Sequence, residues 1–240
     1  MTGRARLLLF DLDGTLVDSA PDIAIAVDAA LAAQGRPSIG LEAVRGYIGN
    51  GASRLIHRAL TGTRDGDAEP AVFDAVYASF LELYQARLFV DSQVYPGVET
   101  VLRTMVDAGW TLGVVTNKPE RFTRPLLEAA GLAGSFAVVL SGDSLPRKKP
   151  DPMPLVHAAA EVGAALAQTV LIGDSVTDIE AARLAGVAAI CVSYGYAGGI
   201  DLTALIDVRI IDEMQELPAV IAEIGRSQRF VPDSTGVDIK

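Results

Sequence analysis

Cysteine and histidine are scarce in this sequence, which has one cysteine and two histidines among 240 residues. A single thiol cannot form a disulfide within the chain, so no intrachain disulfide framework is expected. Cys191 lies in the apolar run 188–192 and is interpreted as a small buried residue rather than a catalytic thiol. His57 and His157 do not follow any predicted strand, so we interpret both as surface or packing residues rather than ligands.

The sequence also lacks a long apolar run. Hydrophobic residues make up 50% of the chain, yet no run approaches the roughly 18 residues that a membrane helix needs. The segment Met1 to Phe10 reaches the charged Asp11 too early for a signal peptide. We therefore expect a soluble, cytoplasmic protein with no membrane partner.

Basic residues are outnumbered, with 20 Lys and Arg against 30 Asp and Glu and a formal net charge of −10. Proteins that bind nucleic acids normally carry a basic face, so no nucleic acid partner is expected. A small phosphorylated substrate remains compatible, because one lysine and one metal ion can make a site locally positive. The run Arg147-Lys148-Lys149 is such a local concentration of charge. The sequence is compatible with either a monomer or a homodimer.

Short apolar runs alternate with helical patterns along most of the chain, and this alternation predicts an α/β fold. We expect a Rossmann-like parallel sheet covered by helices on both faces, formed by residues 1–18 and 95–225. The segment 98–105 shows helical spacing and is followed by Gly109, where a helix stop belongs. The predicted strands are Arg6 to Phe10, Thr111 to Val115, Phe136 to Leu140, Thr169 to Ile172 and Ala188 to Val192.

Residues 19–94 break this alternation, because they carry helical signals and no convincing strand. Ile23, Val27 and Leu31 lie on one helical face, and the simplest interpretation is an α-helical cap domain inserted after the first strand. At the other end, residues 226–240 are polar, contain proline and have no periodicity. We expect this tail to be poorly ordered.

Two carboxylates follow the first predicted strand at the point where the chain turns. Leu7 to Phe10 leads into Asp11 and Asp13, and Gly14 supplies the turn. Side chains two residues apart on a strand point the same way, so the two acids can converge on one small volume. Like charges at that distance need a metal ion, a shared proton or different roles.

Other polar signals follow later strands, and ligands in parallel sheets bind beyond the carboxyl ends of the strands. Each signal alone is also explained by an ordinary turn, helix cap or solvated lysine. Together they provide carboxylates for a hard cation such as Mg²⁺, with a hydroxyl and an ammonium that can hold a phosphoryl group. These signals are Thr116-Asn117, Lys149-Pro150, Asp174 and Asp178.

Four of these segments resemble the signature motifs of the haloacid dehalogenase superfamily of phosphotransferases, in the same order. The resemblance extends to about Leu217 and departs at no catalytic position. Further segments, among them residues 48–52, 116–119 and 192–196, are similar to the bacterial phosphoglycolate phosphatases. The four signatures are Asp11-Leu12-Asp13-Gly14-Thr15, Val115-Thr116-Asn117, Lys149-Pro150-Asp151-Pro152 and Gly173-Asp174-Ser175-Val176-Thr177-Asp178.

The resemblance implies a role for each catalytic residue. Asp11 would be the nucleophile that forms an aspartyl-phosphate, and Asp13 would be the general acid and base. Thr116 and Asn117 would bind the phosphoryl group, and Lys149 would neutralise charge on the phosphate and on the nucleophile.

The resemblance also implies Mg²⁺ as the cofactor. Its ligands would be the carboxylates of Asp11 and Asp174 and the main-chain carbonyl of Asp13, with waters completing the shell. Asp178 would lie behind these ligands and orient Lys149 or a metal-bound water.

The predicted cap would close over this site and shape the substrate pocket. Gly49, Asn50 and Gly51 are the expected cap contacts to substrate, although the same three residues could simply join two helices. Arg45 could meet a substrate carboxylate or face solvent.

The function predicted from these residues is hydrolysis of a small phosphomonoester in the presence of Mg²⁺. Resemblance favours 2-phosphoglycolate, which would give glycolate and phosphate. Two alternatives remain open at this point: a sugar-phosphate mutase similar to β-phosphoglucomutase, and a phosphatase of the same superfamily for a sugar phosphate or pyrophosphate. A binding module that retains the fold without catalysis is disfavoured by the intact set of acids, threonine and lysine.

Overall fold

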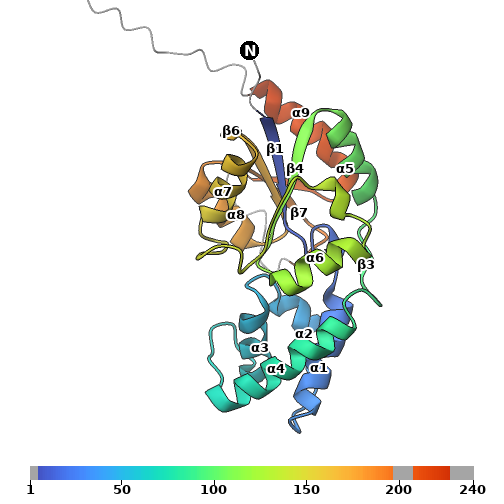
Figure 1. Cartoon of the computed structure of the whole chain (residues 1–240), viewed down its shortest axis with the longest axis vertical. Coiled ribbons are helices and arrows are strands. Elements are labelled where there is room, and N and C mark those ends of the chain that lie inside the picture. The colour runs from blue at the N-terminus through green and yellow to red at the C-terminus, as the bar shows by residue number, and fades with distance from the viewer. Residues whose placement is uncertain (1–4, 197–207, 228–240) are drawn as a thin grey trace, which may run out of the picture.

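A computed structural model describes residues 5–196 and 208–227 of the chain. Its central feature is a parallel six-stranded sheet with the strand order β5-β4-β1-β6-β7-β8. Helices flank this sheet, so the predicted α/β fold is confirmed (Figure 1). The strands are β1 (Ala5–Phe10), β4 (Trp110–Val115), β5 (Val138–Leu140), β6 (Ala164–Gly173), β7 (Ala188–Val192) and β8 (Arg209–Ile211).

The two faces of the sheet are covered by different helices because successive strand residues point to opposite faces. Leu8 and Phe10 pack in one apolar cluster with α5 (Val98–Asp107), α6 (Glu120–Ala129) and α9 (Leu217–Ser227). Leu7 and Leu9 pack in a second cluster with α7 (Met153–Glu161) and α8 (Val176–Ala185). These four apolar residues of β1 are fully buried, which explains why the sequence of β1 is a continuous apolar run rather than an alternating one.

Several strand boundaries differ from the prediction, those of β1 and β4 by only one residue at the start. The predicted strand 136–140 begins only at Val138, and the predicted strand 169–172 is the end of a longer β6 that starts at Ala164. The edge strand β8 was not predicted, because three residues carry too little periodicity to register.

Four consecutive helices form the helical insert, which we define as residues 20–86. They are α1 (Ala20–Ala32), α2 (Gly40–Tyr47), α3 (Ala52–Thr61) and α4 (Pro70–Ala86). A short antiparallel pair, β2 (Val17–Asp18) with β3 (Gln93–Val94), carries the chain out of the sheet and back. The insert lies beyond the end of the sheet at which β1 leads into it (Figure 1).

The poorly ordered tail was predicted to begin at residue 226, but α9 extends to Ser227, so the first two residues of this tail are helical. Residues 228–240 lie outside the described residues. No helix in the described part of the chain is both long and apolar enough to span a membrane.

A buried carboxylate on α1 anchors the segment that returns from the insert. Asp22 is fully buried and accepts hydrogen bonds from the main-chain N–H groups of Val90, Asp91 and Ser92 at 2.8–3.1 Å. The Ser92 hydroxyl donates to the same carboxylate at 2.6 Å, and Arg87 Nε lies 3.1 Å from its other oxygen. Each donor would lose its partner without this carboxylate, and unpaired buried polar groups are costly.

Replacement of this carboxylate should therefore destabilise the protein strongly. We expect Asp22→Ala to lower the free energy of unfolding by about 2–4 kcal/mol, because three successive N–H groups and the buried Ser92 hydroxyl lose their acceptor, while Arg87 keeps its pairing with Asp91. Urea denaturation followed by circular dichroism measures this change. Asp74→Ala on α4 is the matched control, since Asp74 is exposed and surface changes of this kind usually stay within about 0.5 kcal/mol. Equal effects of the two substitutions would contradict the anchoring role.

Candidate active site

Asp11 lies at the centre of the sheet, directly after β1 and between the ends of β4 and β6. Its main-chain N–H donates to the carbonyl of Ile172 at 2.9 Å, which extends the β1–β6 pairing by one residue. Its carboxylate Oδ1 accepts from the N–H of Leu12 at 2.8 Å. The side chain is buried yet lines a pocket, so the sheet presents one oriented carboxylate to that pocket.

Gly14 allows the chain to turn closely past a second acid. Its φ is +84°, a left-handed conformation that residues with a Cβ rarely adopt. A Cβ at this position would collide with the carboxylate of Asp174. That carboxylate is buried, accepts from the N–H of Tyr196 at 2.6 Å, and lies 3.4 Å from the Thr15 hydroxyl. The glycine turn therefore brings the first and fourth sequence motifs into contact.

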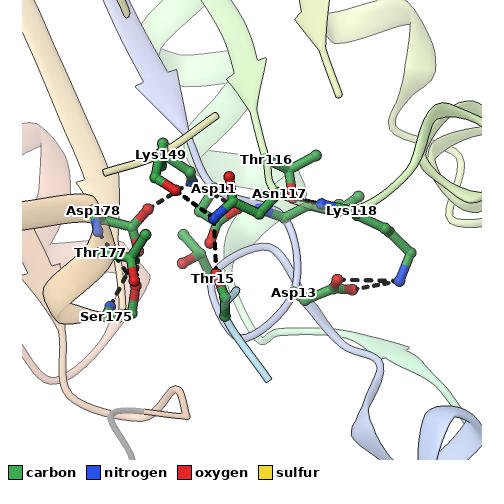
Figure 2. Close-up of polar contacts among 12 residues, drawn as sticks. Asp11, Asp13, Thr15, Thr116, Asn117, Lys118, Lys149, Ser175, Thr177 and Asp178 are labelled. Carbon is green, nitrogen blue, oxygen red and sulfur yellow. Dashed lines mark hydrogen bonds and ion pairs between the residues drawn. The ribbon is translucent and has the colours of Figure 1, made fainter. Parts of the chain in front are cut away.

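Lys149 bridges Asp11 and Asp178. Its Nζ lies 3.0 Å from an oxygen of Asp11 and 2.6 Å from an oxygen of Asp178, and the lysine side chain is only 1% exposed. The second oxygen of Asp178 accepts from the N–H and hydroxyl of Ser175, which forms a capping box at the start of α8. Figure 2 shows this chain of contacts from α8 to Asp11. Asp178 thus contacts Lys149, one of the two partners that the family resemblance implied for it.

Negative charge exceeds positive charge at this point. Oxygens of Asp11, Asp174 and Asp178 lie within 4.8 Å of one another, and all three residues are buried. Burial raises the pKa of Asp11 to about 6 against the opposing effect of Lys149, and burial and the neighbouring Asp178 raise the pKa of Asp174. Burial opposes the charged form of Lys149, but the two adjacent carboxylates raise its pKa overall.

This donor set fits a hard divalent cation. Three carboxylates against one ammonium leave two negative charges, which a divalent cation balances, and Mg²⁺ prefers oxygen ligands. Asp174 has a weakly engaged oxygen for this purpose, since its contact with Thr15 is 3.4 Å long. The oxygens of Asp178 are already engaged with Lys149 and Ser175. Asp11 and Asp174 are therefore the residues best suited to hold the ion.

Thr116 and Asn117 follow β4 and are buried beside Asp11 (Figure 2). The Thr116 hydroxyl accepts from the N–H of Lys118 at 3.2 Å. The Asn117 amide donates to the carbonyls of Gly49 and Lys149, each at 2.9 Å, while its Oδ1 is buried and without a hydrogen-bond partner. Asn117 therefore ties the Lys149 loop and the helical insert to the end of β4.

Asp13 points away from Lys149 and Asp178, and its carboxylate makes a separate ion pair (Figure 2). Lys118 Nζ lies 2.9 and 3.1 Å from the two oxygens of Asp13, and the Ser19 hydroxyl donates to one of them at 2.5 Å. The same Nζ donates to the hydroxyl of Tyr84 on α4 at 2.7 Å. The proposed contribution of Asp13 to a metal, through its main-chain carbonyl, stays a prediction.

Sequence reasoning gave no role to Lys118, Ser19 or Tyr84. The available signal was the position of Lys118, directly after Thr116-Asn117 at a strand end. The helical spacing of the apolar residues around Tyr84 does not reveal that its hydroxyl reaches a distant lysine.

A pocket lies between the end of the sheet and the helical insert. The sheet side provides polar groups, whereas the insert side is mainly apolar. Its lining consists of Asp11, Asp13, Ile23, Ile48, Gly49, Gly51, Ala52, Leu55, Phe80, Tyr84, Thr116, Asn117, Lys118, Pro119 and Phe122.

The loop of Gly49, Asn50 and Gly51 contacts the sheet side of this pocket. Gly49 and Gly51 line it, whereas the Asn50 side chain donates to the Thr177 hydroxyl at 3.2 Å and its carbonyl accepts from Lys148 at 2.9 Å. Gly51 has a φ of +87°, and a Cβ there would press against the Asn117 carbonyl. The loop is therefore packed against the candidate site.

The structure does not bring Arg45 to the pocket lining. Its guanidinium pairs with Asp18 at 3.1 Å and with Glu42 at 3.6 Å. Asp18 also accepts from the Tyr196 hydroxyl at 2.5 Å, so Arg45 belongs to a network beside β2.

The two histidines and the one cysteine lie outside the candidate active site. His57 stacks on Phe73 with ring centroids 4.0 Å apart, and His157 lies 3.7 Å from Glu161 on α7. Cys191 is fully buried within β7, and burial raises the pKa of its thiol to about 12. These positions agree with the packing roles expected for all three.

Residues 8–192 match the family of haloacid dehalogenase-like hydrolases. The chain belongs to this family and is therefore a hydrolase, and the resemblance seen in the sequence motifs is confirmed. The matched region begins in β1 and ends at the last residue of β7, so it includes every strand end that contributes to the site.

Relatives with the same overall length share a more specific name. The chain is 41% identical over 218 residues to the phosphoglycolate phosphatase of Thiobacillus denitrificans, covering 91% of this chain and 96% of that protein. It is 42% identical over 216 residues to the phosphoglycolate phosphatase of Nitrosospira multiformis, covering 90% and 95%. The crystal structure of a predicted phosphoglycolate phosphatase from Haemophilus somnus superimposes with a TM-score of 0.85 at 33% identity, covering 92% and 99%.

The glycine turn beside Asp174 provides a test of this geometry. An alanine at a left-handed position costs about 1–2 kcal/mol, and Gly14→Ala should cost more because its Cβ also displaces Asp174. Gly35→Ala is the matched control, since Gly35 has a φ of +66° and open space around it. We expect Gly35→Ala to retain thermal stabilisation by added Mg²⁺ and Gly14→Ala to lose it. Equal Mg²⁺ responses in thermal denaturation would contradict the placement of Asp174 in the cation site.

Proposed function

We propose that this protein is a Mg²⁺-dependent phosphatase that hydrolyses 2-phosphoglycolate to glycolate and phosphate through an aspartyl-phosphate on Asp11. The observation that carries the proposal is the convergence of Asp11, Thr116, Lys149 and Asp174 at the carboxyl ends of neighbouring strands, where Asp11 and Thr116 line a pocket. This set supplies a nucleophile, phosphate-binding groups and a cation site within one small volume.

In the first step, an oxygen of Asp11 attacks the phosphorus atom and the bond to the substrate's bridging oxygen breaks. Asp13 lies two residues further, on the pocket lining, and in its protonated form gives its proton to the departing oxygen. The products of this step are the alcohol and an acyl phosphate on Asp11. Carboxylates serve as nucleophiles in this way because one difficult displacement becomes two easier ones.

Charge on the transferring group is balanced by residues at neighbouring strand ends. Lys149 stays beside Asp11 and offers an ammonium to the phosphoryl oxygens, and the Thr116 hydroxyl donates to another. Bound to Asp11 and Asp174, Mg²⁺ would supply further positive charge to the phosphoryl oxygens. Asp178 keeps Lys149 oriented during this step.

In the second step, water attacks the phosphorus atom of the aspartyl-phosphate and the bond to Asp11 breaks. Asp13 accepts the proton of that water, which restores its starting state. Phosphate leaves and Asp11 is free for another cycle.

We further propose that residues 19–94 act as a cap domain on a catalytic core of residues 1–18 and 95–225. The insert contributes the apolar side of the pocket, and an apolar cover excludes water while the phosphoryl group is transferred. Gly49 and Gly51 of the insert line the pocket and lie against Asn117, one of the residues proposed to bind the phosphate.

The reaction type is supported by the site, whereas the choice of 2-phosphoglycolate as substrate is supported by the names of the relatives. A phosphate-release assay compares 2-phosphoglycolate with β-glucose 1-phosphate, phosphoserine and pyrophosphate, each with Mg²⁺ and with a chelator. We expect 2-phosphoglycolate to give the highest kcat/KM and the chelator to remove nearly all turnover. Isomerisation of β-glucose 1-phosphate without phosphate release would instead identify a mutase.

Removal of the nucleophile should stop the reaction without unfolding the protein. We expect Asp11→Asn to lower kcat by about 1,000-fold or more, because an amide is a poor nucleophile and cannot form the acyl phosphate. Phosphate release measures turnover, and circular dichroism confirms folding. Asp107→Asn, at the exposed end of α5, is the matched control and should retain full activity. Retained turnover in Asp11→Asn would exclude Asp11 as the nucleophile.

A further inference from the structure

Lys118 is a buried lysine in the pocket lining to which neither step of the proposed reaction assigns a task. Its side chain is 3% exposed. Among the described residues that line the pocket, it is the one that carries positive charge. Lys149 does not line the pocket and is held between Asp11 and Asp178.

Lys118 is held in position by hydrogen bonds of both its main chain and its side chain. Its main-chain carbonyl accepts from the N–H of Gly142 at 2.8 Å and from the Thr123 hydroxyl at 3.1 Å. Its Nζ donates to Asp13 and to the Tyr84 hydroxyl, and it lies 4.7 Å from the centre of the Tyr84 ring. Loops after two strands, helix α6 and the helical insert therefore all contribute to placing this one charge.

The pairing with Asp13 has a consequence for catalysis. When Asp13 turns to the bridging oxygen of a substrate, it gives up contacts to Lys118 of 2.9 and 3.1 Å. A buried ammonium without an anionic partner is costly. A substrate that carries its own anion close to the bridging oxygen would replace the lost partner.

We infer that Lys118 is a specificity-determining residue that binds a carboxylate of the substrate and so selects short phosphorylated carboxylic acids. The inference rests on the proposed function and names the group that recognises the non-phosphate end of the substrate. In 2-phosphoglycolate the carboxylate carbon is two bonds from the bridging oxygen, so a carboxylate beside Asp13 is within reach of Nζ. The remaining far side of the pocket is formed by apolar side chains such as Ile48, Leu55 and Phe80, which cannot pair with an anion.

This assignment differs from the one predicted from the sequence, in which Arg45 was the candidate partner for a substrate carboxylate. Arg45 is paired with Asp18 and does not line the pocket. Lys118 lines the pocket beside the proposed acid and base, where the carboxylate of a two-carbon acid must lie.

The first test changes the substrate and leaves the protein intact. It compares kcat/KM for 2-phosphoglycolate with that for 2-phosphoglycolamide, a neutral analogue of the same shape. We expect a preference of about 100-fold for the acid, since loss of one partner of a buried charge pair has effects of this size. Equal hydrolysis of the two compounds would overturn the inference and leave the phosphatase proposal intact. Hydrolysis of neither compound, nor of other phosphomonoesters, would overturn the proposed function itself.

The second test changes the lysine. We expect Lys118→Met to reduce the preference for the acid to within a few-fold of unity, because the neutral side chain no longer distinguishes acid from amide. Lys148→Met is the matched control: Lys148 also contacts the helical insert, through the Asn50 carbonyl, and its substitution should leave the preference unchanged. A preference that persists in Lys118→Met would overturn the inference, because a lysine that only positions Asp13 would affect both substrates equally.

Tyr84→Phe keeps the assignment testable if Lys118→Met does not fold. It removes only the hydroxyl that accepts from Nζ at 2.7 Å and retains the ring. We expect the preference for the acid to fall several-fold, because Lys118 loses one of its fixed contacts. An unchanged preference in this folded variant would count against Lys118 as the carboxylate-binding group.

Discussion

The charge balance around Lys149 is the interaction on which the rest of the site depends. Three buried carboxylates come together at the end of β1, and one ammonium lies between two of them. Such an arrangement is stable only if each charge has a partner in fixed geometry. The capping box at the start of α8 orients Asp178, Asp178 orients Lys149, and Lys149 contacts Asp11. The remaining negative charge is the reason that a cation fits this position.

The helical insert is joined to the same edge of the sheet by polar contacts as well as by apolar packing. Asn117 donates to the Gly49 carbonyl, and Lys118 contacts Tyr84. Both contacts come from the loop after β4 that also carries Thr116. The residues proposed to bind phosphate and the contacts with the insert therefore share one short segment, so a group bound there would also touch the residues that hold the insert.

Much of the fold and the centre of the site could be predicted from sequence because both follow from local patterns. The apolar runs identified five strands, and residues at their carboxyl ends must meet at one edge of a parallel sheet. The family resemblance implied that Asp178 orients either Lys149 or a metal-bound water, and in the structure the Asp178 carboxylate lies 2.6 Å from Lys149 Nζ. The anchoring role of Asp22 was not predicted, because its partners lie about seventy residues away in sequence and carry no motif. No role was predicted for Lys118 for a similar reason, since no local sequence pattern indicates that a lysine will be buried against Asp13 and Tyr84.

The sequence by itself determined the class of fold, the family and the residues available for phosphoryl transfer. These depend on hydrophobic periodicity and on short motifs, and both are properties of neighbouring residues. The tertiary structure decided which charged groups pair with one another. It paired Arg45 with Asp18, outside the pocket, and Lys118 with Asp13, inside it. Long side chains from distant segments choose partners according to distance and burial, and those quantities exist only after the chain has folded.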